Sequence, residues 1–226
     1  MKTKRMLIIL FSIFLFLPSI NIISLTEAQE EKTREVSDVT NLLRLLGKKI
    51  SDFNNLKTDF VEEKDLAIFQ KKIVLKGRVC IQKPNKIAWH VDKPIKYSVV
   101  ITDTSILQWD EETNQVQEIS LSQNPVFQNV LNQLTVWFTG DFTTFLEDYT
   151  IRVLRKSPFV IEFIPKEKNI AGKFVKSITI TLREDERYLK QIKIQETNGD
   201  STTITFNDTI INVPLDSLDF EVKRRV

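Results

Sequence analysis

Histidine and cysteine, the residue types on which nucleophilic triads and zinc sites most often depend, are scarce in this 226-residue chain. The chain has one histidine, His90, and one cysteine, Cys80. A Ser–His–Asp triad or a Cys–His pair would have to use that single histidine, and a zinc site needs several ligands of these types. One cysteine also excludes an internal disulfide. We therefore expect a protein that is not an enzyme, with no catalytic residue, no metal site and no cofactor.

The acidic run Glu184-Asp185-Glu186 is the remaining candidate for a cation site. A calcium loop spaces its oxygen ligands along the chain and places a glycine among them. Three consecutive acids are too compact to do this, so we expect a solvated turn.

The charge and composition of the chain limit its partners. Hydrophobic residues make up 42% and charged residues 27% of the sequence, which is enough apolar content for a folded core. The formal net charge is +2, and the excess cations Lys2, Lys4 and Arg5 lie at the N-terminus. Without residues 1–28 the positive and negative side chains are equal in number. Because nucleic-acid binding depends on neutralising phosphates, a neutral chain argues against a nucleic-acid partner.

The N-terminus has the features of an export signal. An apolar run over residues 6–17 follows the basic start, and Thr26-Glu27-Ala28 places small residues at positions −3 and −1 of a cut after Ala28. Pro18 interrupts the run before it reaches the roughly 20 apolar residues of a membrane span. We predict a cleavable signal peptide over residues 1–28 and a single exported domain over residues 29–226.

Three amphipathic stretches are predicted to be helices. The first begins at Ser37 or Asp38, after the polar residues 29–36, which we expect to be loose. Asn124-Pro125 begins the second and Asp141 the third. Apolar residues three and four positions apart place one stripe on each helix. The stripes are Val39, Leu42, Leu43, Leu46, Ile50 and Phe53; then Phe127, Val130, Leu131, Leu134 and Phe138; and last Phe142, Phe145, Leu146 and Tyr149.

Most of the remaining chain alternates between apolar and polar residues, as half-buried strands do. Asn198-Gly199 is a strong hairpin turn. About eleven strands with short connections and no βαβ crossover predict an α+β fold with one antiparallel sheet. The predicted strands are 71–82, 86–92, 97–102, 106–109, 116–121, 151–154, 159–164, 174–182, 188–196, 202–207 and 218–222.

The alternation also assigns faces within the strand of residues 86–92. Ile87, Trp89 and Val91 share the apolar face. His90 has the opposite parity, so we expect it at the surface. Cys80, on the preceding strand, is predicted to be a buried small hydrophobic residue.

A sheet with one apolar face needs a cover, and only three helical stripes can supply it. About ten strands curl strongly, and a curled sheet under few helices can enclose a space. An ordinary packed core is the alternative. Periodicity does not distinguish the two.

Several stretches, taken in order, resemble the LolA family of periplasmic lipoprotein carriers. Residues 55–60 are similar to the family's passage from its first helix to its first strand. Residues 77–89 are similar to its strand–turn–strand signature, in which a Gly precedes a basic residue, Pro and then Trp. Thr139-Gly140-Asp141 resembles the helical insert, and Asn198-Gly199-Asp200 begins the closing strands. The resemblance covers roughly residues 40–222.

The resemblance implies an incomplete, curled antiparallel barrel with a helical lid that encloses an apolar cavity for acyl chains. Exposing one sixteen-carbon chain to water costs about 12 kcal/mol, so acylated proteins need a carrier to cross the periplasm. By resemblance the partners are acylated lipoproteins, an inner-membrane ABC-type lipoprotein releasing complex and an outer-membrane acceptor. The carrier would act as a monomer. The chain has no nucleotide motif, so transfer should be passive.

The resemblance also assigns site residues. Lys83 stands where the family has an Arg that holds the lid, so it is the predicted lid latch; it keeps the charge but lacks the planar guanidinium. Ordinary core contacts are the alternative for each apolar site residue. The predicted cavity and lid residues are Leu42, Leu46, Ile50, Phe53, Ile87, Trp89, Val91, Phe127, Leu131, Leu134 and Phe138.

A lipid-sensing regulatory module of the envelope-stress type has the same half-barrel and is the alternative function. Co-purification of acylated protein, with transfer to an acceptor, would favour the carrier. Tight binding to a membrane anti-sigma factor would favour the regulator.

Overall fold

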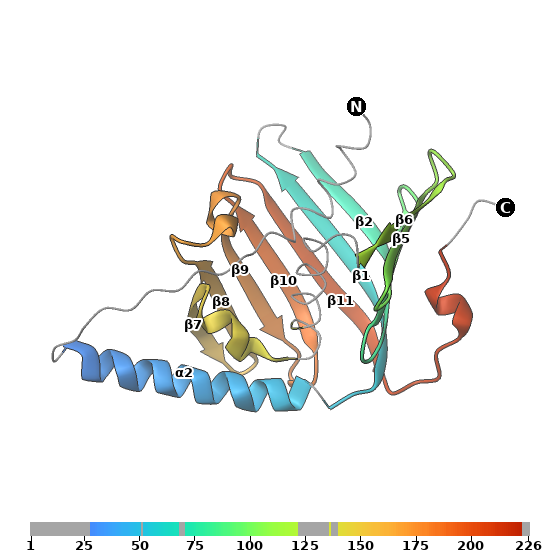
Figure 1. Cartoon of the computed structure of the whole chain (residues 1–226). Coiled ribbons are helices and arrows are strands. Elements are labelled where there is room, and N and C mark those ends of the chain that lie inside the picture. The colour runs from blue at the N-terminus through green and yellow to red at the C-terminus, as the bar shows by residue number, and fades with distance from the viewer. Residues whose placement is uncertain (1–27, 51, 68–70, 122–135, 137–139, 223–226) are drawn as a thin grey trace. The chain divides into compact units, whose positions relative to one another are not determined.

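The computed structural model of the protein describes residues 28–50, 52–67, 71–121, 136 and 140–222. Its eleven described strands form one sheet in the order β6-β5-β4-β3-β2-β1-β11-β10-β9-β8-β7 (Figure 1). The sheet is antiparallel and open, with β6 and β7 at its edges. This confirms the predicted antiparallel sheet of about eleven strands.

The chain divides into two compact units, which are described separately. The first unit comprises Met1–Asp52, Asn129–Leu189 and Lys193–Gly199. The second unit comprises Phe53–Gln128, Lys190–Ile192 and Asp200–Val226.

Seven strands belong to the second unit, and their period-two sequences explain them. Residues paired directly across neighbouring strands point to the same face, so the register fixes which side chains meet. The twelve-residue β1 was expected only from the family resemblance, because its Glu and Lys residues hide the alternation. The strands are β1 (Asn55–Leu66), β2 (Lys71–Gln82), β3 (Lys86–Lys93), β4 (Tyr97–Ile101), β5 (Ser105–Asp110), β6 (Val116–Ser120) and β11 (Ser201–Ile211).

The predicted strand over residues 218–222 is wrong. Ser217–Phe220 form the short 3-10 helix η4 instead. The Asp216 side chain accepts a hydrogen bond from the Leu218 backbone N–H, and the Asp219 side chain accepts one from the Asp216 backbone N–H. This reciprocal capping box satisfies the backbone donors at the start of the turn, so the segment has no need of a strand partner.

The first unit contains three of the remaining strands, both ends of the fourth, whose residues Lys190–Ile192 belong to the second unit, and most of the described helical structure. Asp141 precedes a 3-10 helix, η2 (Phe142–Leu146), which is shorter than predicted because Tyr149 begins β7. Gly199, with a φ of 95°, makes the predicted Asn198-Gly199 turn. The other elements are β7 (Tyr149–Lys156), β8 (Phe159–Pro165), η3 (Ile170–Lys173), β9 (Val175–Leu182) and β10 (Leu189–Glu196).

Helix α2 (Ala28–Ile50) begins well before the predicted start. Residues 29–36, expected to be loose, are helical, so neither Ser37 nor Asp38 is the cap. This segment has no Gly or Pro and is rich in Glu, Gln, Lys and Arg, which favour helices without any apolar stripe.

Two predicted features lie outside the described residues. One is the signal peptide, whose predicted range ends at Ala28, the first described residue. The other is the second helical stripe, with Phe127, Leu131, Leu134 and Phe138 among the predicted lid residues. Both stay predictions.

Candidate functional site

One face of the second unit carries a continuous row of branched aliphatic side chains, which we call the isoleucine face. Cross-strand pairing links the row from β11 through β1 to β6. Its five central members are at most 7% exposed. The row is Ile211, Leu56, Ile81, Ile87, Ile101, Ile106 and Ile119, and it includes the predicted site residue Ile87.

The next row of the isoleucine face combines Trp89 and valine side chains with the buried polar residues Thr58 and Gln108. Trp89 is half-buried and pairs with the buried Val79 and Val99. The ring centroids of Trp89 and Phe60 lie 4.4 Å apart. Phe60 pairs with Gly77, where the β3 backbone approaches so closely that a Cβ would lie 1.9 Å from the His90 carbonyl oxygen. Ile87, Trp89 and Val91 therefore share one face of β3, as predicted.

An ion pair interrupts this apolar surface toward one end of β1. Glu62 is 3% exposed, and its carboxylate oxygen Oε1 lies 3.6 Å from the Lys64 ammonium. Its cross-strand neighbours are the apolar Leu75 and Ile204. Burial raises the pKa of Glu62, and the nearby Lys64 opposes the rise. Burial, with Glu62 as a second cause, also raises the pKa of Tyr97.

Sequence reasoning missed this ion pair, although a signal existed. Leu56, Phe60, Glu62 and Lys64 have the same parity along β1, so they project from the same side of the strand. Extending the apolar alternation of Leu56 and Phe60 by two residues would have placed a charge on the isoleucine face.

The predicted latch residue contacts a predicted lid residue. The Lys83 ammonium lies 4.0 Å from the centroid of the Phe53 ring, the geometry of a cation–π interaction. The Lys83 backbone N–H donates to the Asn54 carbonyl at 2.9 Å. The turn between β2 and β3 is thus attached to the residues that precede β1. The role of Lys83 as a latch remains a prediction.

The opposite face of β1–β5 is covered by the chain's C-terminal residues 215–222, which we call the C-terminal clasp. Phe220 packs on the buried Cys80, Ala88 and Val100. The Lys86 ammonium lies 4.4 Å from the Phe220 ring centroid, and Lys57 donates to the Asp219 carboxylate at 2.8 Å. Leu107, Leu215 and Val222 complete this cluster. Because of the clasp, β2, β3 and β4 are buried on both faces where Cys80, Ala88 and Val100 lie, and Leu107 of β5 is partly buried there.

The expectation that His90 lies at the surface is wrong. His90 is 2% exposed, with Nδ1 3.0 Å from the Ser98 hydroxyl and Nε2 2.9 Å from the Asp219 carbonyl oxygen. A carbonyl can only accept, so Nε2 carries the proton and donates to it. His90 does lie on the face of β3 opposite Trp89, as the alternation predicted, but the C-terminal clasp buries that face as well. His90 is a structural residue that ties β3 to the clasp.

Cys80 is buried, as predicted, and its thiol is unsuited to nucleophilic chemistry. Burial, followed by the negative charge of Asp219, raises its pKa to about 11. A thiol needs to ionise near neutral pH to react as a thiolate. Both residues that could have supported catalysis therefore serve the packing of the clasp.

In the first unit, α2 packs closely against the start of η2. Leu43, Leu46 and Ile50 are at most 1% exposed, and Leu42 is half-buried. A Cβ added to Gly47 would lie 2.2 Å from the Gly140 carbonyl oxygen. The predicted lid residues Leu46 and Ile50 are therefore core residues of this unit, whatever further role they have.

Aromatic rings fill the space beside this helix contact. Phe145, Tyr149 and Phe163 pack edge to face, with ring centroids between 5.6 and 6.1 Å apart. Phe142 adds a tilted contact with Phe163 at 6.2 Å. These contacts join η2 to β7 and β8.

Two residues of the acidic run form ion pairs. Lys49 of α2 pairs with Glu186, and Arg183 lies 3.2 Å from Asp185. Over the described ranges, no group of three or more His, Cys, Asp or Glu side chains could hold a metal ion. Nor is any helix in the described part of the chain long and apolar enough to cross a membrane.

The geometry groups the predicted site residues into three sets. Ile87, Trp89 and Val91 line the isoleucine face, and Phe53 and Lys83 form a second pair in the same unit. Leu42, Leu46 and Ile50 belong to the first unit. The side chains of the isoleucine face are apolar and favour contact with other hydrocarbon groups over contact with water.

Solved structures share this fold at low sequence identity. The MucA/MucB complex of Pseudomonas aeruginosa superposes with a TM-score of 0.52 and 11% identity, over 83% of this chain and 63% of that chain. An uncharacterized conserved protein from Thermus thermophilus gives a TM-score of 0.50 and 10% identity, over 81% and 92% of the two chains.

Sequence comparison identifies the protein family of the chain, which the shared fold alone does not. It is 24% identical to an outer-membrane lipoprotein carrier protein of Coxiella burnetii over 99% of this chain and 95% of that protein. A carrier of the same description from Helicobacter pylori is 25% identical over 62% of this chain and 74% of its own length. The family model described as outer membrane lipoprotein carrier protein LolA matches residues 51–223. The chain therefore belongs to the LolA family.

Proposed function

We propose that the protein is a periplasmic carrier that holds the acyl chains of lipoproteins against the isoleucine face during transfer from the inner to the outer membrane. The single observation that carries this proposal is the row of aliphatic side chains that runs across seven strands, with Trp89 and Phe60 beside it. Covering a sixteen-carbon chain offsets about 12 kcal/mol of exposure to water. The donor is the inner-membrane ABC-type releasing complex, and the receiver is an outer-membrane acceptor.

The ion pair on the same face suits the polar part of such a cargo. An acylated glyceryl group carries ester and amide carbonyls, which accept hydrogen bonds from a cation such as Lys64. A buried ion pair costs desolvation and seldom adds stability, so its presence on an apolar face favours a role in ligand binding. The acyl chains would lie along the isoleucine row and the glyceryl group near Glu62 and Lys64.

Native mass spectrometry of the protein purified from its own periplasm tests cargo binding. We expect acylated protein to co-purify, and to move to the outer-membrane acceptor but not to empty buffer. Tight binding to a membrane anti-sigma factor, without transfer, would instead support the lipid-sensing alternative.

Tryptophan quenching by acyl chains brominated along their length tests the site itself. The chain has three tryptophans, and Trp137 lies outside the described residues. Two variants are therefore compared, and each of them also carries Trp137→Phe. Trp89 projects from the isoleucine face, whereas Trp109 pairs with Ser98 on the opposite face. We expect strong quenching in the Trp109→Phe variant, which keeps Trp89, and weak quenching in the Trp89→Phe variant. Equal quenching would refute binding on this face.

A further inference from the structure

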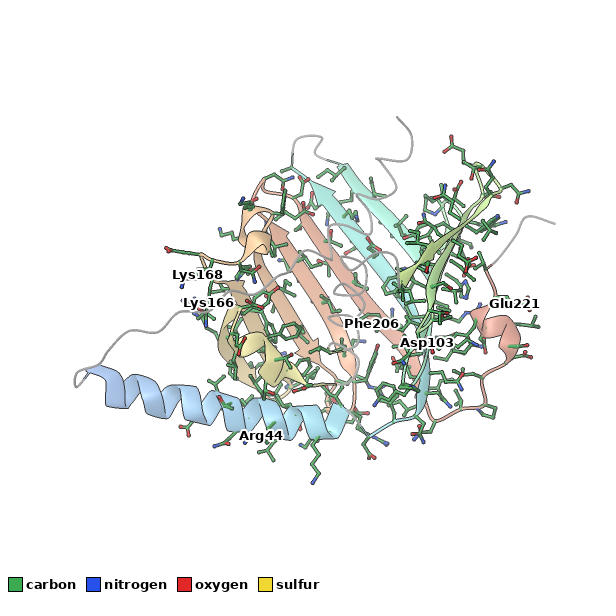
Figure 2. All side chains as sticks on the ribbon, viewed as in Figure 1. Arg44, Asp103, Lys166, Lys168, Phe206 and Glu221 are labelled. Atoms are coloured by element: carbon green, nitrogen blue, oxygen red, sulfur yellow. The ribbon has the colours of Figure 1, made fainter. Side chains whose placement is uncertain are left out.

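The connection from β8 to β9 combines clustered lysines with an exposed aromatic ring. We call residues 166–176, which are this connection and the first two residues of β9, the basic loop; it contains four lysines and one glutamate. Phe174, in its second half, is 54% exposed. Lys166, Lys168, Lys173 and Lys176 are also exposed, and Figure 2 labels the first two on this connection. A neutral mature chain thus carries a local cationic surface around an apolar ring.

Hydrogen bonds hold the basic loop in one conformation. Asn169 is buried; its side chain accepts from the Ala171 backbone N–H at 3.0 Å and donates to the Asp148 carbonyl at 3.2 Å. The Phe174 N–H donates to the Ala171 carbonyl at 2.9 Å, and the Phe174 carbonyl accepts from the Thr197 N–H at 2.9 Å. The exposure of the ring is therefore fixed by the backbone. It does not result from a frayed segment.

We infer that the basic loop docks the protein on a bilayer surface that contains anionic lipids. Lysines near such a surface are attracted to its negative headgroups, and an apolar ring placed among them can enter the interfacial layer. Charge complementarity selects the lipid surface: the loop presents four cations and a single anion, Glu167. A carrier that visits two membranes gains residence time at each from weak, reversible docking. The inference rests on the loop alone and does not require that cargo bind the isoleucine face.

The experiment measures binding of the full mature chain to vesicles of phosphatidylethanolamine with about one third phosphatidylglycerol at low salt. We expect binding to these vesicles and none to pure phosphatidylcholine. Each lysine contributes roughly a fivefold factor, so Lys168→Gln, Lys173→Gln and Lys176→Gln together weaken binding about 100-fold. Phe174→Ser weakens it about tenfold, also at salt concentrations that abolish the lysine effect.

A matched control lies at the other end of the same strands. Leu154 is 56% exposed, and its neighbours Arg155 and Lys156 are exposed too. These residues lie at the end of β7 where Lys156 pairs with Phe159. The basic loop follows the other end, where Tyr149 pairs with Pro165. Leu154→Ser combined with Arg155→Gln and Lys156→Gln removes two cations, against three in the lysine variant, and an apolar side chain in place of Phe174. We expect less than a twofold change in vesicle binding.

Three results would overturn the inference. The first is equal binding to phosphatidylcholine vesicles, and the second is an equal loss of vesicle binding in the control variant. The third is that Phe174 is required for function in cells although the protein binds no vesicles, which would indicate a protein partner. Thermal unfolding of each variant confirms that it is folded. Failure here leaves tryptophan quenching by acyl chains intact, so it is distinguishable from failure of the carrier proposal.

Discussion

The strands of the two units are covered differently. In the second unit, alternate residues of β3 and β4 are buried on both faces: Val91 and Val99 on the isoleucine face, Ala88 and Val100 under the clasp. In the first unit, β7–β9 bury Ile161, Phe163 and Ile180 on one face only. Their other face carries polar side chains such as Arg152, Glu162 and Thr179, none of which is buried.

If cargo binds the isoleucine face as proposed, this difference would let one sheet be rigid and still receive a ligand. A strand packed on one face depends on that face for its stability, so a ligand that changes the packing changes the strand. In the second unit the clasp gives β2–β5 a separate core that a ligand on the isoleucine face does not touch. If cargo binds the isoleucine face as proposed, the clasp core should keep the stability of these strands independent of that binding. The predictions below test this separation.

Gly77→Ala should have the largest effect, because it breaks the doubly covered region from within. An added Cβ would lie 1.9 Å from the His90 carbonyl oxygen, a backbone atom that can move only if β2 and β3 part. We expect a loss of about 4 kcal/mol in the free energy of unfolding, measured by urea denaturation.

Gly172→Ala in the first unit is the control for this change. Its Cβ would meet its nearest neighbour at 3.6 Å, an ordinary contact. We expect a change within about 0.5 kcal/mol. If the two substitutions cost the same, β2 and β3 do not approach as closely as described.

Phe220→Ala removes the centre of the clasp and should cost about 3 kcal/mol. Cys80 lies beneath this ring, so its thiol should react faster with a thiol reagent in the variant. Leu218→Ser, in the same segment but 65% exposed, should change neither quantity. Acyl binding on the isoleucine face should survive Phe220→Ala if the clasp core is separate, and its loss would show that the two faces are coupled.

The strands could be predicted from sequence because their signal is local. Ile87, Trp89 and Val91 alternate with their neighbours, and this alternation set both the strand and its face. The environment of His90 could not be predicted in this way. Its cover comes from Asp219, 129 residues later, and alternation within β3 contains no information about so distant a segment.

Two other wrong or missed predictions could have been corrected from the sequence itself. Leu218, Phe220 and Val222 alternate like a strand, but Asp216 and Asp219 have the spacing of a capping box, which was the better guide. Glu62 could have been placed by parity with Phe60. The close approach of Gly47 and Gly140 joins segments far apart in the chain, and nothing in the sequence near either residue indicates it.

The two faces also differ in how pH acts on their carboxyl groups. Burial raises the pKa of Glu62, so the folded state holds its proton more tightly than the unfolded state does. The stability of the natural protein relative to Glu62→Gln should therefore be greatest at acid pH. It should fall as the pH rises through the ordinary Glu pKa to the raised one.

For Asp219, on the clasp side of the sheet, the pH dependence of stability has the opposite sign. Burial works against its ionisation, but hydrogen bonds from Lys57 and the Asp216 backbone outweigh this and lower its pKa. The natural protein should therefore be more stable than Asp219→Asn at neutral pH, and this difference in unfolding free energy should be lost as the pH falls through the lowered pKa of Asp219. Urea denaturation of both variants from acid to neutral pH measures this, and parallel pH profiles would contradict the assigned environments.

Lys83→Met should have the smallest effect on stability, because it removes one cation from the Phe53 ring while keeping most of the aliphatic stem. A cation–π contact of this kind contributes about 0.5–1 kcal/mol. Lys83→Arg, which keeps a cation able to stack on the ring, should retain that contribution. Thermal unfolding measures the difference between the two variants.

The same pair of variants tests whether Lys83 is a latch. A latch stabilises one state of the carrier relative to another, so its removal must change the rate at which cargo leaves for the acceptor, in proportion to the lost contact: about two- to fivefold for 0.5–1 kcal/mol. A turn residue that only stabilises the fold lowers the unfolding free energy without changing that rate. Slowed or accelerated transfer in Lys83→Met, with normal transfer in Lys83→Arg, would therefore assign the role to the ammonium–ring contact. Unchanged transfer in both would leave Lys83 a structural residue of the β2–β3 turn.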